Sequence, residues 1–184
     1  MDNGQWTKVH WDVYVVAVKN EVKEVLLLGT MDNGQWTMDK VTITSIDLDR
    51  PELAFTFTRE EEQNCPFTFH LSPFTFLYEP NAAILKAGAY KLVAQRFDLQ
   101  KLDVNTHLYA SQTLVADFPG RVWKVKAKGE RLMAKGEKAN VLVRNYPMTA
   151  EQLKKKLRLS DGGETYIIGC RVAGKPTLFC AERV

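Results

Sequence analysis

Basic side chains are the residues in this sequence that are best placed to do chemistry, and they are concentrated in the C-terminal third. Residues 121–184 hold 15 lysines and arginines against 6 acidic residues, whereas residues 1–120 hold 10 against 16. A basic segment that follows an acidic one indicates a polyanionic partner and says little about the fold. The charge distribution therefore predicts a nucleic-acid partner, RNA or DNA.

Three expected elements must position these basic residues. A strand over 121–128 alternates lysines with apolar residues, so the lysines are expected to share one face. A strand over 139–144 leads into an arginine and an asparagine, whose donors can reach a phosphate or a base. A capping box of Thr149 and Gln152 predicts a helix with Leu153 and Leu157 inward and basic residues outward. The predicted nucleic-acid contacts are Lys124, Lys126, Lys128, Arg144, Asn145, Lys154, Lys155, Lys156 and Arg158. A lysine-rich face that is merely solvated has the same pattern, and this alternative stays open.

No group of residues in the sequence has the spacing of a catalytic or metal site. The histidines stand singly, and the acidic run at 60–62 cannot converge on one ion from a strand. Phosphate-binding glycine loops, nucleophile elbows and zinc motifs are absent. The three cysteines, Cys65, Cys170 and Cys180, lack C-x-x-C spacing and fit small buried hydrophobes in a reducing cytosol. We therefore predict no catalytic residue, no metal ligand and a cytoplasmic location.

The sequence also predicts no membrane segment. No apolar run approaches the ~18 residues that a membrane span needs. The first residues lack the basic and apolar regions of a signal peptide. The heptapeptide Met-Asp-Asn-Gly-Gln-Trp-Thr occurs at 1–7 and again at 31–37. Its flanking residues differ between the two copies, so it indicates a local duplication or an artefact and no solenoid repeat.

The remaining segments predict a mixture of strands and helices. Residues 12–18 are nearly all apolar, which is typical of a strand buried on both faces in a parallel sheet. Asn20 is expected to cap a helix over 21–28. Alternation predicts strands over 41–48 and 53–58. These elements, in this order, indicate the end of an open α/β sheet.

The middle and the end of the chain predict an α+β arrangement. Pro80 is expected in the first turn of a helix that continues to about Phe97. Strands over 165–172 and 176–182 are separated by a short glycine-containing link, which predicts a hairpin. Together with the basic strand and helix, this hairpin indicates a small unit in which a helix packs on an antiparallel sheet.

Several motifs, taken in order, resemble one protein family. They are residues 76–88 (Phe-Leu-Tyr-Glu-Pro-Asn and the following seven), 108–109, 118–121, 143–147, 153–157 and 161–163. Their order and spacing resemble the C-terminal part of bacterial class I S-adenosylmethionine-dependent methyltransferases with a THUMP-like domain. Residues 15–21 look like a late strand and helix of the methyltransferase core of that family.

The resemblance implies an α+β fold with an α/β tail, divided into three segments. Residues 1–75 would be the remnant of the methyltransferase core, namely the last strands and one helix of a Rossmann-like sheet. Residues 76–117 would be a ferredoxin-like segment with a helical insert, and residues 118–184 a THUMP-like RNA-binding domain. The full-length family uses S-adenosylmethionine, bound at a glycine-rich turn that this chain lacks. We therefore expect no cofactor in this chain, and no activity from the chain alone.

Three functions remain open at this point. The first is an RNA-binding, substrate-recognition portion of a methyltransferase. The second is a complete enzyme, which the missing cofactor loop and the missing nucleophile disfavour. The third is a non-catalytic interaction or oligomerisation module. In that case the Phe-Thr-Phe repeats at 67–69 and 74–76 would form an exposed apolar surface through which two copies make a homodimer.

Overall fold

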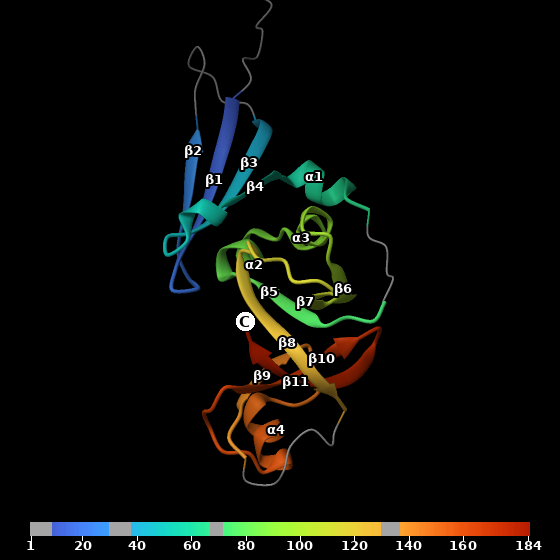
Figure 1. Ribbon diagram of the computed structural model, residues 1–184. Helices are drawn as coiled ribbons and strands as arrows, with labels where there is room; N and C mark the ends of the chain where they lie inside the picture. Colours follow the sequence, from blue (N-terminus) through green and yellow to red (C-terminus); the bar gives the residue numbers. More distant parts are fainter. Residues whose placement is uncertain (1–8, 30–37, 67–71, 130–136) are drawn as a thin grey trace, which may run out of the picture. The chain divides into compact units, whose positions relative to one another are not determined.

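The computed structural model describes residues 9–29, 38–66, 72–129 and 137–184, which form two compact units (Figure 1). One unit comprises Met1–Phe67 and Asn81–Val93, and the other comprises Thr68–Pro80 and Ala94–Val184. Both copies of the heptapeptide and the Phe-Thr-Phe repeat at 67–69 lie outside the described residues.

The first unit is built on a four-stranded sheet. Its strands are β1 (Val9–Val18), β2 (Glu21–Gly29), β3 (Met38–Asp47) and β4 (Phe55–Thr58). Their order is β2-β1-β3-β4, with β1 and β3 parallel and with β2 and β4 as antiparallel edges. Val15 and Ala17 pack against Ala83 of helix α2 (Ala82–Ala87). The predicted strands over 12–18 and 41–48 are confirmed, and the one over 53–58 begins only at Phe55. Strand β1 is not buried on both faces, because between residues 12 and 18 only Val15 and Ala17 are buried.

The predicted helix over 21–28 is wrong, because this segment is strand β2. Lys19 and Asn20 have φ angles of 51° and 59°, the left-handed values that a type I′ hairpin turn requires. Asn20 caps no helix of its own. Its Oδ1 accepts a hydrogen bond from the Ala82 amide at 2.8 Å. The apolar run at 25–28 has no helical period, so pairing with β1 decided its conformation.

The predicted single helix from Pro80 to Phe97 is two helices, α2 and α3 (Tyr90–Arg96). Pro80 is the last residue of a strand, and Asn81 is the N-cap, whose Oδ1 accepts from the Ile84 amide at 2.9 Å. Gly88 ends α2 with a φ of 86°, a left-handed conformation that glycine adopts readily.

Two short helical segments complete the first unit. They are the 3₁₀ helix η1 (Pro51–Leu53) and α1 (Arg59–Asn64), which begins with a capping box between Thr58 and Glu61. The Glu62 carboxylate accepts hydrogen bonds from the Lys91 and Leu92 amides, at 2.8 and 3.0 Å. Glu62 thus satisfies backbone donors in the first turn of α3.

The second unit contains a seven-stranded sheet. Its strands are β5 (Phe76–Pro80), β6 (Gln100–Asp103), β7 (Thr106–Ser111), β8 (Gly120–Lys128), β9 (Asn140–Arg144), β10 (Thr165–Val172) and β11 (Lys175–Arg183). Their order is β6-β7-β5-β8-β11-β10-β9. The strands predicted over 121–128, 139–144, 165–172 and 176–182 are confirmed. The sheet is mixed and not purely antiparallel, because β9 runs parallel to β10.

Helix α4 (Ala150–Leu157) packs on this sheet, and its predicted capping box is confirmed. Thr149 accepts from the Gln152 amide at 3.2 Å, and Gln152 accepts from the Thr149 amide at 2.9 Å. Leu153 is fully buried with Ile167 and Leu178, whereas Leu157 is only half-buried at the edge of that cluster. The helix ends at Arg158, which has a left-handed φ of 56°.

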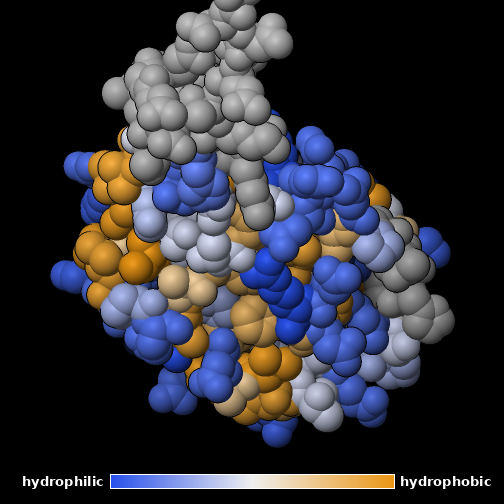
Figure 2. Space-filling model, turned by 90° about the horizontal axis from the view of Figure 1, so that it is seen from above, coloured by the Kyte–Doolittle hydropathy of each residue, from blue (hydrophilic) through white to orange (hydrophobic). Residues whose placement is uncertain are grey.

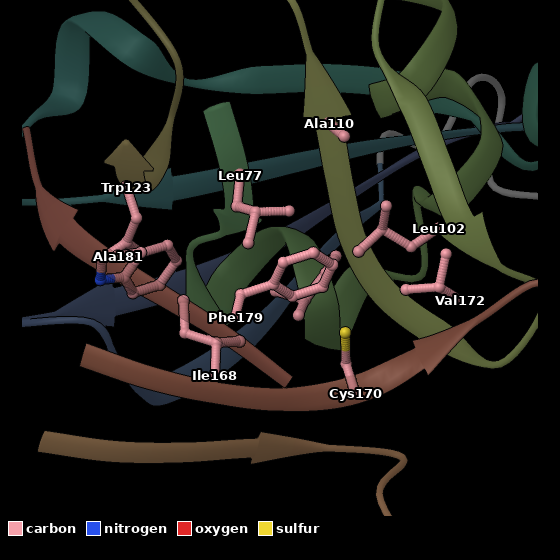
Figure 3. Packing of buried hydrophobic residues seen from close by; sticks show 10 residues of the cluster. Leu77, Leu102, Ala110, Trp123, Ile168, Cys170, Val172, Phe179 and Ala181 are labelled. Atoms are coloured by element: carbon pink, nitrogen blue, oxygen red, sulfur yellow. The ribbon is translucent and has the colours of Figure 1, made fainter. Parts of the chain in front are cut away.

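The seven-stranded sheet curves around a hydrophobic core made of alternate residues of its strands. Leu77, Trp123, Ile168 and Phe179 come from four strands and point into this core (Figure 3). The turn between β10 and β11 reaches the edge strand β6 across this face, since the Ala173 amide donates to the carbonyl of Leu102 at 3.0 Å. The side chains on this face are therefore enclosed by the sheet itself.

None of the three cysteines forms a disulfide. Cys65 and Cys170 are buried, as predicted for small hydrophobes, whereas Cys180 is only partly buried. Cys170 lies opposite Thr177 and Cys180 lies opposite Ile167 on the paired strands, so the two thiols do not face each other. Within the described ranges, no helix combines the length and the apolar character that crossing a membrane requires.

Candidate nucleic-acid interface

Strand β8 presents Lys124 and Lys126 on the face of the sheet opposite the core. Trp123 is buried in the core, whereas Lys124 and Lys126 are exposed. The pairing of β8 with β11 skips Lys126, which forms a β-bulge. The Nζ of Lys126 lies 2.8 Å from the carboxylate of Glu182.

The bulge reverses the alternation along β8, so the prediction that three lysines share one face is wrong for Lys128. Lys128 lies directly opposite Phe179, a core residue, on the neighbouring strand. Its Nζ is 5.9 Å from the centroid of that ring. Directly opposed residues project to the same side of a sheet. Lys128 therefore belongs to the edge of the core face and is separate from the other two lysines.

Helix α4 adds basic residues to the outer face of the same sheet. Leu153 packs on Ile167 and Leu178, which alternate along their strands with core residues, so α4 covers the side of the sheet that carries Lys124. Lys155, Lys156 and Arg158 are exposed, and Lys154 pairs with Asp161. Basic residues in the last helical turn also interact favourably with the helix dipole. We call Lys124, Lys126, Lys154, Lys155, Lys156 and Arg158 the outer basic face.

Arg144 and Asn145 do not join the outer basic face. Leu142 packs against the core, and Arg144 follows it by two residues, so Arg144 projects to the core side. Its Nε forms an ion pair with Glu79, and its Nη1 donates to the Val143 carbonyl at 2.9 Å. The Nδ2 of Asn145 is 3.4 Å from Oγ1 of Thr106.

Arg144 forms a second charged group with Glu79 and Arg121. The sequence did not predict Glu79 or Arg121 as site residues. Glu79 is only 2% exposed, and its carboxylate accepts from Arg121 Nε at 2.9 Å and from Arg121 Nη2. The Arg121 guanidinium lies 5.3 Å from the Trp123 ring centroid, within the range of a cation–π contact. The alternation of Leu77 and Glu79 in strand β5 could have indicated that both side chains face the core. Assigning Pro80 to the first turn of a helix concealed this strand pattern.

The turns that follow β1 and β3 differ from the turn of an S-adenosylmethionine site. Such a site needs a glycine-rich turn from a strand into a helix, with an acidic residue for the ribose. β1 runs instead into the hairpin turn at Lys19 and Asn20. At the end of β3, Asp47 accepts from the Asp49 amide at 3.2 Å and Asp49 accepts from the Lys19 amide at 2.5 Å, so both carboxylates serve turns. Among the same residues, no cluster of three or more potential metal-ligating side chains was found.

Comparisons with known proteins now identify the two segments of the chain. Residues 76–119 match a ferredoxin-like domain family, and residues 118–183 match a THUMP domain-like family. The chain therefore contains a ferredoxin-like and a THUMP-like domain in an α+β fold, as the resemblance implied.

The chain is also similar to one solved structure along nearly its whole length. That structure is described as a putative methyltransferase from Porphyromonas gingivalis W83, and the two sequences are 32% identical. The superposition has a TM-score of 0.83 and covers 96% of this chain but 46% of the other. The chain thus spans about half the length of this neighbour. A comparison with curated proteins found no match.

Proposed function

We propose that this chain is the RNA-recognising portion of a methyltransferase-related protein, and that the outer basic face binds the RNA backbone. The observation that carries the proposal is the exposure of Lys124, Lys155 and Arg158 together with the lack of acidic partners for them among the described residues. All three are exposed, and within the described part of the chain none of them pairs with a carboxylate.

Lysines that are not neutralised by the protein can neutralise phosphates. Each contact releases condensed counterions from the nucleic acid, which supplies affinity without regard to sequence. RNA is favoured over DNA because THUMP-type domains are associated with RNA-modifying enzymes, and the basic residues lie in the THUMP-like segment. Phosphate contacts position a nucleic acid and do not read its bases.

In this proposal, methylation is carried out by a longer methyltransferase, of which this chain is the RNA-recognising portion. We place the S-adenosylmethionine site outside the described residues, because the turns of β1 and β3 do not fit it. The absence of a disulfide among the three cysteines, two of which are buried, supports a reducing, cytoplasmic compartment.

The experiment is filter binding of labelled single-stranded RNA over a series of salt concentrations. If three to five basic residues contact phosphates, log K should fall with log salt at a slope of about −2 to −3.5. A chain that retains no RNA at low salt, or whose retention ignores salt, contradicts the proposal.

A second candidate function is a module that associates with its own copy through strand β2. This strand is an edge of the first sheet, and residues 25, 26, 27 and 28 are exposed by 48%, 44%, 64% and 56%. Hydrophobic surface is visible on the left of Figure 2, the side on which Figure 1 draws β2. An exposed apolar edge strand is a template for pairing with another strand.

A hollow of about 1020 Å³ adjoins this edge. The apolar residues that line it are Val13, Val15, Val25, Leu27, Val41, Ile43 and Ala87. The Phe-Thr-Phe repeat at 74–76 does not supply the predicted apolar surface, because Phe74 packs on Phe179 with ring centroids 5.6 Å apart. We therefore propose antiparallel pairing of two β2 strands as the contact of a homodimer, a two-fold arrangement in which each strand meets its equivalent.

Sedimentation of the wild type and of Leu27→Lys tests the homodimer. We expect the wild type to dimerise with little dependence on salt and Leu27→Lys to be monomeric. Val104→Lys, at a residue equally exposed at 64% in the other unit, should dimerise as the wild type does. A monomeric wild type at high protein concentration would rule out this association.

A further inference from the structure

The buried carboxylate of Glu79 lies between two arginines of the second unit. It forms ion pairs with Arg121 and with Arg144, whose side chains are 28% and 39% exposed. Removing an isolated carboxylate from water costs far more than a single surface ion pair returns, so buried acids are held by several charged donors. Here the carboxylate receives three hydrogen bonds from the two guanidinium groups.

Four strands bring this group together at one end of the curved sheet. Glu79 pairs with Arg121 across β5 and β8, and both residues project to the core side because Leu77 and Trp123 do so two positions away. Gly120 permits the close approach, since a Cβ there would lie 2.0 Å from the carbonyl oxygen of Glu79. Asn145, which follows β9, reaches Thr106 of β7 in the same region.

Each arginine keeps donors that the protein does not use. Arg121 gives Nε and Nη2 to Glu79, and Arg144 gives Nε to Glu79 and Nη1 to a backbone carbonyl. Among the described residues, no hydrogen bond is found from Arg121 Nη1 or from Arg144 Nη2. Because both side chains are partly exposed, these two nitrogen atoms can meet a ligand.

The charge of the group favours an anion. Two guanidinium groups and one carboxylate leave a net charge of one positive unit. Lys101 carries a positive charge close to Thr106, the residue that Asn145 contacts. It is 6% exposed, and its ammonium donates to the carbonyl of Thr106 at 2.9 Å. Burial, and then the charge of Lys101, lower the pKa of His107, which follows Thr106. The Asp103 carboxylate, two residues from Lys101, offsets the charge of Lys101, so the group keeps the single net positive charge of its own side chains.

We propose that Arg121 and Arg144, held in place by Glu79, clamp one phosphate group of the bound RNA. The inference rests on the proposed RNA-binding function and assigns a phosphate site on the core side of the sheet, distinct from the outer basic face. The planar fork of arginine matches the oxygens of phosphate, and two forks fixed by one carboxylate are oriented before the ligand arrives. Glu79 is a positioning residue, because it acts through the arginines.

A clamp and a purely electrostatic surface predict opposite effects of Glu79→Gln on the affinity for RNA. Glu79→Gln raises the local charge by one unit, so a purely electrostatic surface would bind RNA more tightly after this substitution. A clamp would bind RNA more weakly, because the guanidinium groups lose the charge that orients them. Arg121→Lys and Arg144→Lys retain the charge but lose the fork, and they keep the proposal testable if Glu79→Gln does not fold.

The experiment measures fluorescence anisotropy of a labelled 12-nucleotide single-stranded RNA with the full chain, its fold checked by thermal unfolding. We expect Arg121→Lys and Arg144→Lys each to weaken binding by about tenfold, the effect of losing a charged hydrogen bond. Glu79→Gln should also weaken it. Arg50→Lys is the matched control, since Arg50 pairs with Glu52 at 3.4 Å on the other unit, and it should bind as the wild type does.

A second measurement separates failure of the clamp from failure of the proposed function. Inorganic phosphate is titrated while the NMR signals of the arginine Nε–H groups are followed. If RNA binds but the lysine variants equal the wild type and phosphate leaves the Arg121 and Arg144 signals unchanged, the clamp is overturned and RNA recognition stands. If RNA does not bind but phosphate shifts these two signals, the anion site stands and the proposed function is overturned.

Discussion

Burial decides what the individual ionisable side chains of this protein can do. Burial, and then the charge of Asp103, raise the pKa of the Cys170 thiol to about 12. Burial also raises the pKa of Cys180. A thiol is nucleophilic as the thiolate, so neither cysteine is a candidate nucleophile near neutral pH. The residues with chemical potential are the arginines and lysines whose charge the fold leaves accessible.

The raised pKa of Cys170 predicts a pH dependence of stability. In the unfolded chain a thiol loses its proton near pH 8.5, whereas Cys170 in the folded chain keeps it to about pH 12. Between these values the unfolded state binds fewer protons, so stability falls by up to about 1.4 kcal/mol per pH unit from this group. Cys170→Ala removes this contribution.

Urea unfolding of the wild type and of Cys170→Ala at pH 7.5, 9 and 10 measures the effect. The wild type should be the more stable of the two at pH 7.5, and its advantage should shrink as the pH rises. An advantage that stays constant over this range would show that the thiol is not protected by burial.

The roles of single residues were only partly predictable from the sequence. The sequence predicted which side chains are basic and exposed, as with Lys124 and Lys155. Their partners were not, because Arg144 meets Glu79 across 65 positions of the chain and the closure of a curved sheet creates that contact. Lys128 was misplaced for a related reason, since a β-bulge depends on pairing with β11 and leaves no mark in the sequence of β8.

Elements were predictable where local pattern and tertiary packing agree. The capping box of Thr149 and Gln152, followed by inward leucines, defines α4 by itself. Residues 21–28 fail this condition, because an apolar run without a period is compatible with helix and strand alike. The turn at Lys19 and Asn20, which decides between the two, uses left-handed conformations that lysine rarely adopts.

The docking of α4 depends on Leu153 more than on Leu157. Leu153 is fully buried, whereas Leu157 keeps contact with solvent. We expect Leu153→Ala to lower the free energy of unfolding by about 2–5 kcal/mol, and Leu157→Ala to lower it by distinctly less. Urea denaturation followed by circular dichroism compares the two variants. Equal effects, or an effect of Leu153→Ala below about 0.5 kcal/mol, would mean that α4 is not docked through Leu153.

At the scale of the whole molecule, the seven-stranded sheet of the second unit joins the two recognised domains. β5, of the ferredoxin-like domain, pairs directly with β8, the first strand of the THUMP-like domain. The two domains therefore share hydrogen bonds, and the basic residues of β8 lie on a surface fixed by this sheet. Sequence motifs revealed the two domains, but a continuous sheet between them follows only from pairing between distant strands.

The most direct test of the account is charge reversal on the outer basic face. Lys124→Glu with Lys155→Glu removes two accessible lysines, and Lys23→Glu with Arg50→Glu makes the same change in charge on the other unit, where Glu21 and Glu52 are their partners. Single-stranded RNA is titrated against each variant from low to moderate salt. The account predicts weaker binding for the first variant, with a slope of log K against log salt reduced by about 1.4, and an unchanged control. Binding curves of the first variant that coincide with those of the wild type and of the control would contradict it.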